Sequence, residues 1–432
     1  MPANSSSAAA SVPDDSLENE PRSVSGQNHS ALRVVAQRNF GLFFCGASLS
    51  NIGTWFQNIA QAILVYRLTG SSLFVGLVNL AQFSGVIFLV PWTGAAADRF
   101  NRRRLLLITQ VADVMITATL AGLVAAHEVS VVTVILFALA LGVSSAFAGP
   151  AQQALVPALV DRHDIGSATV MVSVTFNIAR AVGPVLGVLV ITTAGIATAF
   201  ALNSVSFLAL IVALLLIKVR PGQVAVRRPR LRETISMVRR NRVVGMLLLV
   251  VAAAAMCSDP ITTLGPQFAT QVFHYPDTAA GWIIGAFGVG AVLAALLTRS
   301  NRKRPYLRML ATVLAMFGGL AAFALAPGLG FGLGALVVMG FGYLATHTSA
   351  TTELQLTVSD AERGRVMALW GIAFGATRPL GSLIDGTLAG PLGARGAALV
   401  MSVPLALTAL LLVSGGHLGR RSALASSEVL VE

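Results

Sequence analysis

Charged residues are scarce in this sequence of 432 residues. Asp, Glu, Lys and Arg together make up 11% of it, whereas a typical soluble protein carries about 25%. So few charges cannot cover the water-facing surface of so long a chain. Apolar residues make up 55%, and the mean hydropathy is +0.77. The composition therefore excludes an ordinary soluble protein and predicts a chain whose surroundings are mostly lipid.

Sequence patterns for metal binding, ATP binding and secretion are also missing. The two cysteines, Cys45 and Cys257, each lie in an apolar run and are expected to pack as small hydrophobes. No Cys/His spacing indicates a metal site. No G-x-x-x-x-G-K-[ST] loop is present, so ATP is not the direct energy source and no cofactor is expected. The first 30 or so residues lack the pattern of a signal peptide and predict a disordered cytoplasmic tail.

The formal charge of +12 would usually suggest a nucleic-acid partner. The basic residues are concentrated in short gaps between apolar runs, as in Arg102–Arg104 and Arg302–Arg304. That distribution is typical of the cytoplasmic loops of membrane proteins. We therefore expect a lipid bilayer, and no nucleic acid, around this chain.

Apolar runs long enough to cross a bilayer, which takes about 20 residues, recur along the whole chain. The sequence predicts an all-α membrane protein with about twelve transmembrane helices. A short turn near 192–195 separates the fifth from the sixth, and Pro260, Gly265 and Pro266 interrupt the seventh. The expected spans are 40–66, 73–96, 104–126, 131–150, 166–191, 196–217, 243–270, 279–298, 307–326, 331–354, 366–388 and 397–415.

The basic loops predict the orientation. They follow the even-numbered helices, whereas the opposite loops carry few basic residues, with Arg67 and Arg395 as exceptions. Both termini should therefore lie in the cytoplasm of a bacterium, with the chain in its inner membrane. The longest loop divides the chain into tail 1–38, half 39–217, linker 218–242, half 243–418 and tail 419–432. In this linker Leu231, Ile235 and Val238 mark either an amphipathic surface helix or a solvated basic segment.

The two halves share a pattern. Arg180-Ala-Val-Gly183 in the fifth helix recurs as Arg378-Pro-Leu-Gly381 in the eleventh. Parallel repeats related by an axis along the membrane normal are one known transporter architecture. The repeat favours a chain of two six-helix halves.

The loop after the second helix has the sequence GAAADRFNRRR. It resembles the G-x-x-x-D-R-x-G-R-R loop of the major facilitator superfamily, with Asn101 in place of the second glycine. The stretches LVYRLTGSSLFVGLV, PAQQALVPALV and ERGRVMALW are similar to the branch of enterobactin exporters and macrolide-efflux proteins. The resemblance implies the major facilitator fold and export of small organic molecules, usually driven by protons. The matching residues of the loop are Gly94, Asp98, Arg99, Arg102 and Arg103.

The resemblance makes this loop a conformational latch. It implies that Asp98 meets the start of helix eleven near Gly364, and that Arg102 finds Asp161 or Asp164. Alternatively, the arginines only enforce topology. The fifth helix resembles the antiporter motif at Gly183, Pro184 and Gly187, beside Arg180, although Val188 replaces its last glycine. These small residues could equally serve close helix packing.

Polar stripes mark two helices that the family places beside a central cavity. The first helix carries one at steps of three and four residues, and the seventh carries Asp259, Thr263 and Gln267. Such stripes face either a substrate cavity or partner helices with which they form hydrogen bonds. The stripe of the first helix comprises Ser48, Asn51, Thr54, Asn58 and Gln61.

Ionisable residues inside a membrane are costly and usually functional. Asp259, just before Pro260, is the first candidate for proton coupling, and Arg378 could be linked to Asp385 two turns along one face. Helix three is peripheral in the family, so Asp113 could be a packing residue. His347 is expected to be a hydrogen-bonded core residue. The set of candidates for proton coupling is Asp259, Asp113, Glu353, Asp385 and Arg378.

Together these features predict a monomeric secondary transporter that exports a siderophore or a drug-like molecule by alternating access, with proton antiport. The alternatives are an importer or facilitator of a small metabolite, a membrane enzyme, and a sensor that has lost transport. The enzyme is disfavoured because no catalytic constellation lies at a membrane face.

Overall fold

The computed structural model describes residues 33–89, 92–93, 100–218, 241–298 and 305–414. Every regular element in this part of the chain is a helix, in agreement with the predicted all-α class. Four predicted features lie outside the described residues. They are the N-terminal tail up to residue 32, the amphipathic segment at 231–238, the latch residues Gly94, Asp98 and Arg99, and the C-terminal tail 419–432. The end of the predicted tail 1–38 is described, and its residues 33–36 are helical with Val34 fully buried, so the predicted disordered tail is too long there.

The first group of helices comprises α2 (Arg38–Thr69), α3 (Ser72–Phe88), α5 (Arg102–Ala125), α6 (Val131–Leu155) and α7 (Ile165–Leu216), with the short η2 (Val156–Ala158) and η3 (Arg162–Asp164) before α7. Polar side chains cap three of them. Ser71 accepts from the Leu73 amide, and Ser130 accepts from the Thr133 amide. Asn101 accepts from the amides of Arg103 and Arg104. The asparagine that departs from the family's glycine thus starts α5 as one of the best N-cap residues.

The second group begins with α9 (Arg242–Met256), α10 (Pro260–Thr263), α11 (Gly265–Gln267), the π-helical η4 (Phe268–Val272) and η5 (Asp277–Ala279). It continues with α12 (Ala280–Leu297), α13 (Pro305–Ala324), α14 (Leu329–Thr357) and α15 (Asp360–Val400), and residues 403–414 are again helical. The predicted seventh helix is therefore broken into pieces, and Pro260 and Pro266, which lack an N–H donor, each lie in the first turn after a break.

Two long helices turn at a glycine. α7 has 52 residues and contains Gly195 at φ 86°, while α15 has 41 residues and contains Gly393 at φ 66°. A positive φ is costly for residues with a Cβ, so glycine suits both positions. Gly195 lies at the predicted turn between the fifth and sixth spans, and Gly393 lies between the predicted eleventh and twelfth.

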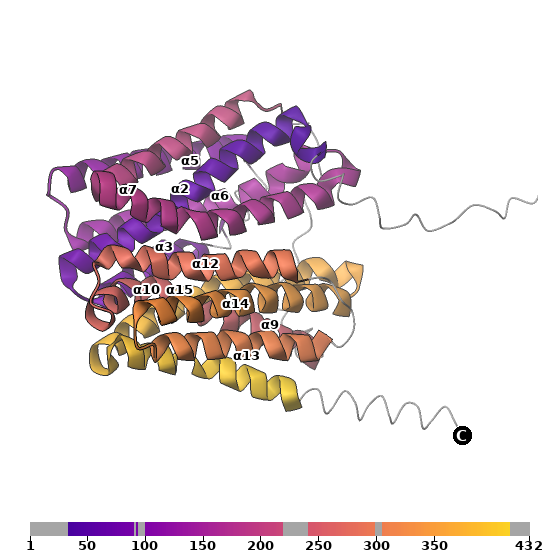
Figure 1. The fold of residues 1–432 in the computed structure, drawn as a ribbon. Helices are drawn as coiled ribbons and strands as arrows, with labels where there is room; N and C mark the ends of the chain where they lie inside the picture. The colour runs from indigo at the N-terminus through magenta and orange to yellow at the C-terminus, as the bar shows by residue number, and fades with distance from the viewer. Residues whose placement is uncertain (1–32, 90–91, 94–99, 219–240, 299–304, 415–432) are drawn as a thin grey trace, which may run out of the picture.

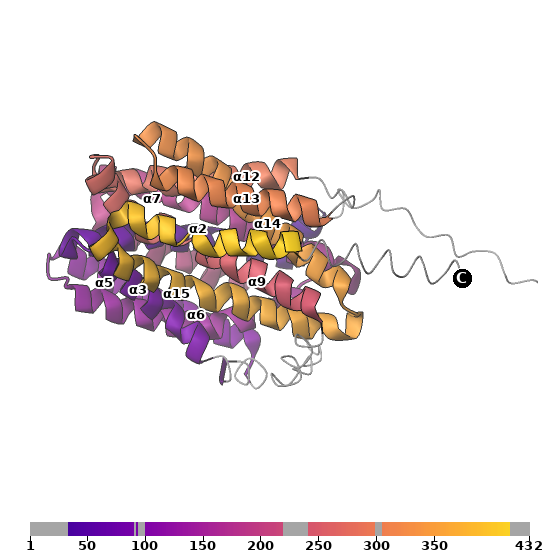
Figure 2. The same cartoon turned by 90° about the horizontal axis from the view of Figure 1, so that it is seen from below.

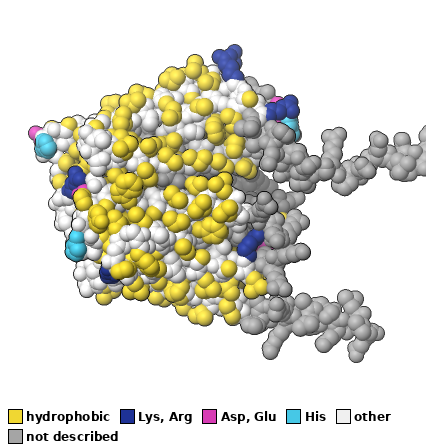
Figure 3. All heavy atoms as spheres, viewed as in Figure 1, with side chains coloured by type: hydrophobic (Ala, Val, Ile, Leu, Met, Phe, Trp, Pro, Cys, Tyr) yellow, Lys and Arg dark blue, Asp and Glu magenta, His cyan; other side chains and the backbone are white. Residues whose placement is uncertain are grey.

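The helices are suited to lipid. In the described residues, eight helical stretches are long and apolar enough to cross a bilayer, and the two longest contain the breaks at Gly195 and Gly393. α2 and α3 are not among the eight, so the number twelve remains a prediction. Hydrophobic side chains are spread over the whole described face in Figure 3, and charged ones lie toward its two ends. Leu296 and Leu410, for example, are 73% and 65% exposed.

The two groups of helices lie side by side (Figure 1). Within the first group α2 packs along α7, and within the second α14 packs on α12 and α13. Contacts of α3 with α15 and of α7 with α12 join the groups, and Figure 2 shows α3 beside α15 from below. We call residues 33–218 the first half and residues 241–414 the second half.

The start of α2, α5 and α9 and the ends of α6 and α7 lie at one end of the molecule, which carries Arg38, Arg102–Arg104 and Arg242. We call it the basic end. The opposite end carries Gly70, Glu128 and Asp277.

Candidate functional site

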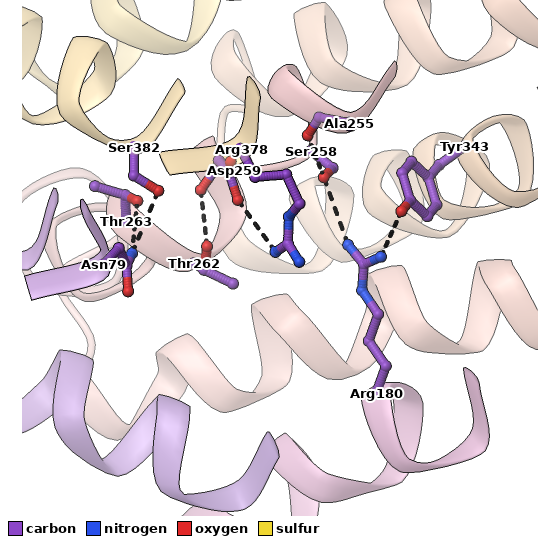
Figure 4. A network of polar contacts seen from close by, with 10 residues as sticks. All are labelled: Asn79, Arg180, Ala255, Ser258, Asp259, Thr262, Thr263, Tyr343, Arg378 and Ser382. Carbon is purple, nitrogen blue, oxygen red and sulfur yellow. Dashed lines mark hydrogen bonds and ion pairs between the residues drawn. The ribbon is translucent and has the colours of Figure 1, made fainter. Parts of the chain in front are cut away.

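A buried ion pair lies where α9 gives way to α10. Asp259 is 2% exposed, and its Oδ1 accepts a hydrogen bond from Arg378 Nη2 of α15 at 3.2 Å (Figure 4). Arg378 is itself 6% exposed. Two buried charges are tolerated in this way because each neutralises the other. The break before Pro260 positions the carboxylate, and the eleventh predicted helix supplies the guanidinium.

Asp385 lies two turns beyond Arg378 on α15 but does not pair with it. The prediction that Arg378 and Asp385 are linked is wrong. Seven residues of helix separate them by roughly 10 Å, and Arg378 instead reaches across to Asp259. Asp385 is fully buried, and neither of its carboxylate oxygens has a hydrogen-bond partner among the described residues. It lies near Asp259.

Arg180 carries a second guanidinium from the first half into the second. Its Nη1 donates to the Tyr343 hydroxyl and its Nη2 to Ser258 Oγ at 3.5 Å (Figure 4). Its Cζ lies 4.5 Å from the centre of the Tyr343 ring and 5.3 Å from that of Trp55. Aromatic faces stabilise a cation that has left water. The two arginines of the sequence repeat thus converge on the break in the seventh span.

A small cavity of about 30 Å³ lies between the halves at this cluster. We call it the interhalf cavity. Asp259 and Arg378 line it together with Trp55 and Asn58 of α2 and Asn79 of α3. Asn79 Nδ2 donates to Thr263 Oγ1 at 3.3 Å and to Ser382 Oγ at 3.4 Å. Charges, amides and an aromatic ring therefore meet in one place between the halves.

A second and larger cavity lies inside the first half. We call it the first-half cavity. Its volume is about 190 Å³, and residues of α2, α3, α5, α6 and α7 line it. Asp113 is among them and is 5% exposed. Although the resemblance made helix three peripheral, this carboxylate faces the interior of its own half.

The polar stripe on α2 is divided among several partners. Asn51 and Thr54 line the first-half cavity, and Asn58 lines the interhalf cavity. Gln61 Nε2 donates to Gln82 Oε1 at 3.2 Å. Ser48 Oγ donates to the carbonyl of Phe44 at 2.6 Å. The residues of the stripe share one face of α2, but that face passes both the first-half cavity and the interhalf cavity.

Further polar contacts join the halves away from the basic end. Gln267 Oε1 accepts from Ser72 Oγ at 2.7 Å, and the hydroxyls of Tyr66 and Thr270 lie 3.1 Å apart. The sequence reasoning named Gln267, together with Thr263, as cavity-lining. In this structure the two residues bind across the boundary between the halves.

An ion pair at the same end was missed. Arg67 donates from Nε to Asp277 Oδ2 at 2.6 Å and from Nη2 to Oδ1 at 2.8 Å. It joins the end of α2 to η5, and so joins the two halves. The hydrogen bond to Asp277 raises the pKa of Arg67. The sequence contained a signal for this pair. Arg67 is one of the few basic residues in the loops on this side of the chain.

The described part of the latch lies within the first half. Arg102 Nη1 donates to the Ala154 carbonyl at 3.2 Å. Arg103 donates to the carbonyls of Leu214 and Leu215 near the end of α7, where cations are favoured by the helix dipole. Asp164 Oδ2 accepts from Gln37 Nε2 at 2.7 Å.

The antiporter-like motif lies at the contact of α7 with α2. A Cβ on Gly183 would come within 2.6 Å of the Trp55 Cβ, and one on Gly187 within 2.7 Å of the Ile59 Cγ2. Pro184 lines the interhalf cavity. The glycines thus allow the backbone of α7 to approach α2 at the level of the polar cluster.

The remaining candidates lie on α14. His347 contacts the rings of Tyr343, Trp370 and Phe374, with centres 5.9, 5.1 and 4.9 Å away. Its Nε2 has no hydrogen-bond partner, so the expected hydrogen bond is not seen at that atom. Glu353 lies four residues before the end of α14 and is partly exposed.

Comparison with known proteins places this architecture in a family. The sequence profile of the family described as "Transmembrane secretion effector" matches residues 29–428. The resemblance inferred from the loop after the second helix is thereby confirmed.

Three curated relatives extend this match. The Staphyloferrin A transporter of Staphylococcus aureus is 25% identical over 79% of this chain and 87% of its own. The Multidrug efflux pump Tap of Mycolicibacterium fortuitum is 26% identical over 85% of this chain and 93% of its own. The Enterobactin exporter EntS of Citrobacter koseri is 26% identical over 85% and 86%, respectively.

The fold has solved counterparts. A bacterial homologue of the human lysosomal transporter Spinster, solved in an inward-facing and unoccupied conformation, superimposes with a TM-score of 0.72 at 14% identity. The match covers 90% of this chain and 97% of that one. These relatives and neighbours are transporters rather than enzymes. The chain therefore belongs to the transmembrane secretion effector family of the major facilitator superfamily, and it is a multi-pass membrane transporter of small molecules.

Proposed function

We propose that this protein exports a small, partly hydrophobic organic compound, a siderophore or a drug-like molecule, from the bacterial cytoplasm in exchange for protons. The observation that carries the proposal is the buried polar cluster between the halves, where Asp259, Arg378 and Arg180 meet aromatic rings. The relatives support the substrate class and the direction, since one is a siderophore exporter and one a multidrug efflux pump by name.

The basic end faces the cytoplasm in this proposal. It carries Arg102–Arg104 and Arg242, and short loops rich in arginine stay on the cytoplasmic side of a bacterial inner membrane. Both termini then lie in the cytoplasm, and the loops at Glu128 and Asp277 face outward. We expect one chain to complete the transport path, because both halves of the cluster come from the same chain.

The contacts opposite the basic end close the outer face in the state described. Arg67 with Asp277, Ser72 with Gln267 and Tyr66 with Thr270 all tie the first half to the second there. The similar solved structure is inward-facing, which agrees with closure of the outer face. These three contacts must break before substrate can leave to the outside. In the opposite state, in which the cytoplasmic face is closed, the latch at Asp98 would hold the halves together.

Proton coupling is assigned to Asp259 with Asp385 beside it. The pair with Arg378 stabilises the charged form of Asp259, and a proton on Asp259 would remove the charge that holds this pair. The pair ties the α9–α10 break to α15, so gaining or losing the proton would change how these helices are held. Asp385, buried and without a hydrogen-bond donor, is a second acceptor within electrostatic reach. Buried carboxylates of this kind mark proton relays in transporters.

Substrate flux through the purified protein tests the proposal. Proteoliposomes would be loaded with a catecholate siderophore, a citrate-type siderophore or ethidium, with and without a pH gradient. We expect one class to move against its concentration gradient only when protons can flow the other way. Downhill movement that does not depend on the pH gradient would identify a facilitator instead. If none of the compounds moves, the result would favour a sensor that has lost transport.

A further inference from the structure

The first-half cavity has no role in the mechanism above, and it is unusual for a bundle core. Its third and fourth helices, α5 and α6, present polar side chains to it. The third and fourth helices of the second half, α13 and α14, contact each other mostly through buried apolar side chains, including Val313, Met316 and Met339. The buried polar pair in this contact, Thr346 and Thr312, is joined by a hydrogen bond of 2.9 Å. The polar side chains around the first-half cavity therefore call for an explanation.

Asp113 is the charged residue of this cavity. Its Oδ2 accepts from Gln110 Nε2 at 3.2 Å, whereas its Oδ1 has no hydrogen-bond partner in the part of the chain that the structure describes. Ser144 lies beside it but donates its hydroxyl hydrogen to the Thr109 carbonyl at 3.2 Å. Gln110 Oε1 is likewise buried without a donor. Two buried acceptors lining one cavity require a donor, because an unpaired buried acceptor costs free energy.

Among the described residues that line the cavity, none is a cation facing Asp113. α2 contributes the neutral Asn51, Thr54 and Gln57, α3 contributes Gln82, α6 contributes Ser145 and Gln152, and α7 contributes Asn203. All other lining residues that these four helices supply are also uncharged. The arginines of α5 lie at its start, nine or more residues away, and Arg103 is bound to the end of α7. Asp113 therefore differs from Asp259, whose charge Arg378 neutralises.

The cavity leads from Asp113 toward the basic end. Along α6 its lining runs from Leu141 to Gln152, which is roughly 16 Å of helix. Gln152 lies three residues before the end of α6, at the basic end, while Asp113 lies eleven residues into α5 from that same end. A cavity of about 190 Å³ into which several amides and hydroxyls point can hold several water molecules. Water can thus connect Asp113 to the basic end.

We propose that Asp113 is a second proton-binding site, which is hydrated through the first-half cavity and is separate from the cluster between the halves. A hydronium ion in the cavity gives its proton to the Asp113 carboxylate and leaves a water molecule. The resulting carboxylic acid donates a hydrogen bond where the carboxylate could not. Gln82 lines both cavities, and its Nε2 donates to Asn58 Oδ1 at 3.1 Å, so the two sites share one amide.

Infrared difference spectroscopy of the purified protein without substrate tests this site. A protonated carboxyl group has a C=O stretch that shifts in D₂O and disappears when the group ionises. We expect Asp113→Asn to remove one such titrating band, and Asp259→Asn to leave that band in place. Glu128→Gln, which removes an exposed carboxylate at the far end of α5, is the matched control and should not alter the band.

Several outcomes would overturn the proposal. An unchanged spectrum in Asp113→Asn would show that Asp113 binds no proton in the accessible pH range. A titration midpoint that moves when Na⁺ replaces choline would identify a metal-cation site. If Asp113→Asn does not fold, Asp113→Glu keeps the acid and should shift the band, and no shift would count against the site. Because no transport is measured, these results are independent of whether the protein exports siderophores.

Discussion

At the scale of single residues, Asp259 and Arg378 form a buried ion pair in which each side chain compensates the charge of the other. Removing one partner of a buried pair leaves an uncompensated charge, which costs about 3–5 kcal/mol. We expect Arg378→Gln to destabilise the protein by that amount, and the double variant with Asp259→Asn to recover most of it. Thermal unfolding of the detergent-solubilised variants measures this cycle. Additive losses in the double variant would show that the two side chains do not interact.

The pair of Arg67 and Asp277 makes a different prediction, because the Arg67 side chain is 47% exposed. Exposed pairs contribute little to stability, so its effect should appear in conformation. Arg67→Asp should increase the labelling of a cysteine at Asn58 by an impermeant thiol reagent added outside, by about two- to tenfold. Reversing both charges, with Arg67→Asp and Asp277→Arg, should restore the slow rate. Fast labelling in the double reversal would argue against an outer closure by this pair.

At the scale of helices, the close contact of α7 with α2 depends on Gly183. Even Gly183→Ala adds a Cβ within 2.6 Å of the Trp55 Cβ, and overpacking of this kind costs about 1–3 kcal/mol. We expect a lower Tm for that variant. Gly371→Ala is the matched control, since a Cβ there meets nothing within 4 Å. Equal Tm values for the two variants would mean that the helices separate readily at Gly183.

Much of the helical framework followed from the sequence. Apolar runs located the helices, and the glycine at 195 and the prolines at 260 and 266 marked breaks, because local backbone chemistry decides these features. The division of the α2 stripe between two cavities could not be predicted, since it depends on which neighbours approach each turn. The partner of Arg378 was mistaken for the same reason. Helical spacing indicates which residues share a face, whereas the approach of α9 selects Asp259 over Asp385.

At the scale of the whole molecule, the asymmetry of basic loops predicts its orientation in the membrane. Single cysteines at Ser5 and Glu128, in a background with Cys45 and Cys257 replaced, would report the two sides. An impermeant thiol reagent should label the cysteine at Glu128 in intact cells and the one at Ser5 only after lysis. The reverse pattern would place the basic end outside and would contradict the proposed orientation.

The two halves also contain ionisable sites of different kinds. Between the halves, Asp259 is paired and lies in a small cavity of about 30 Å³. Inside the first half, Asp113 faces a cavity of about 190 Å³, and none of the described residues that line it is a cation. Exchange of substrate for protons needs an acid whose charge affects the contact of the halves, and Asp259 meets this requirement through Arg378. Asp113→Asn should therefore slow transport without abolishing its dependence on the pH gradient.

The most direct test of the account is uphill transport by Asp259→Asn in proteoliposomes, with a substrate that the wild-type protein accumulates. Asparagine mimics a carboxyl group that never releases its proton, so the cycle can no longer use the gradient. We expect substrate to exchange passively across the membrane at a measurable rate, while accumulation driven by a pH gradient falls to background. Accumulation at the wild-type level in Asp259→Asn would contradict proton coupling through the cluster between the halves.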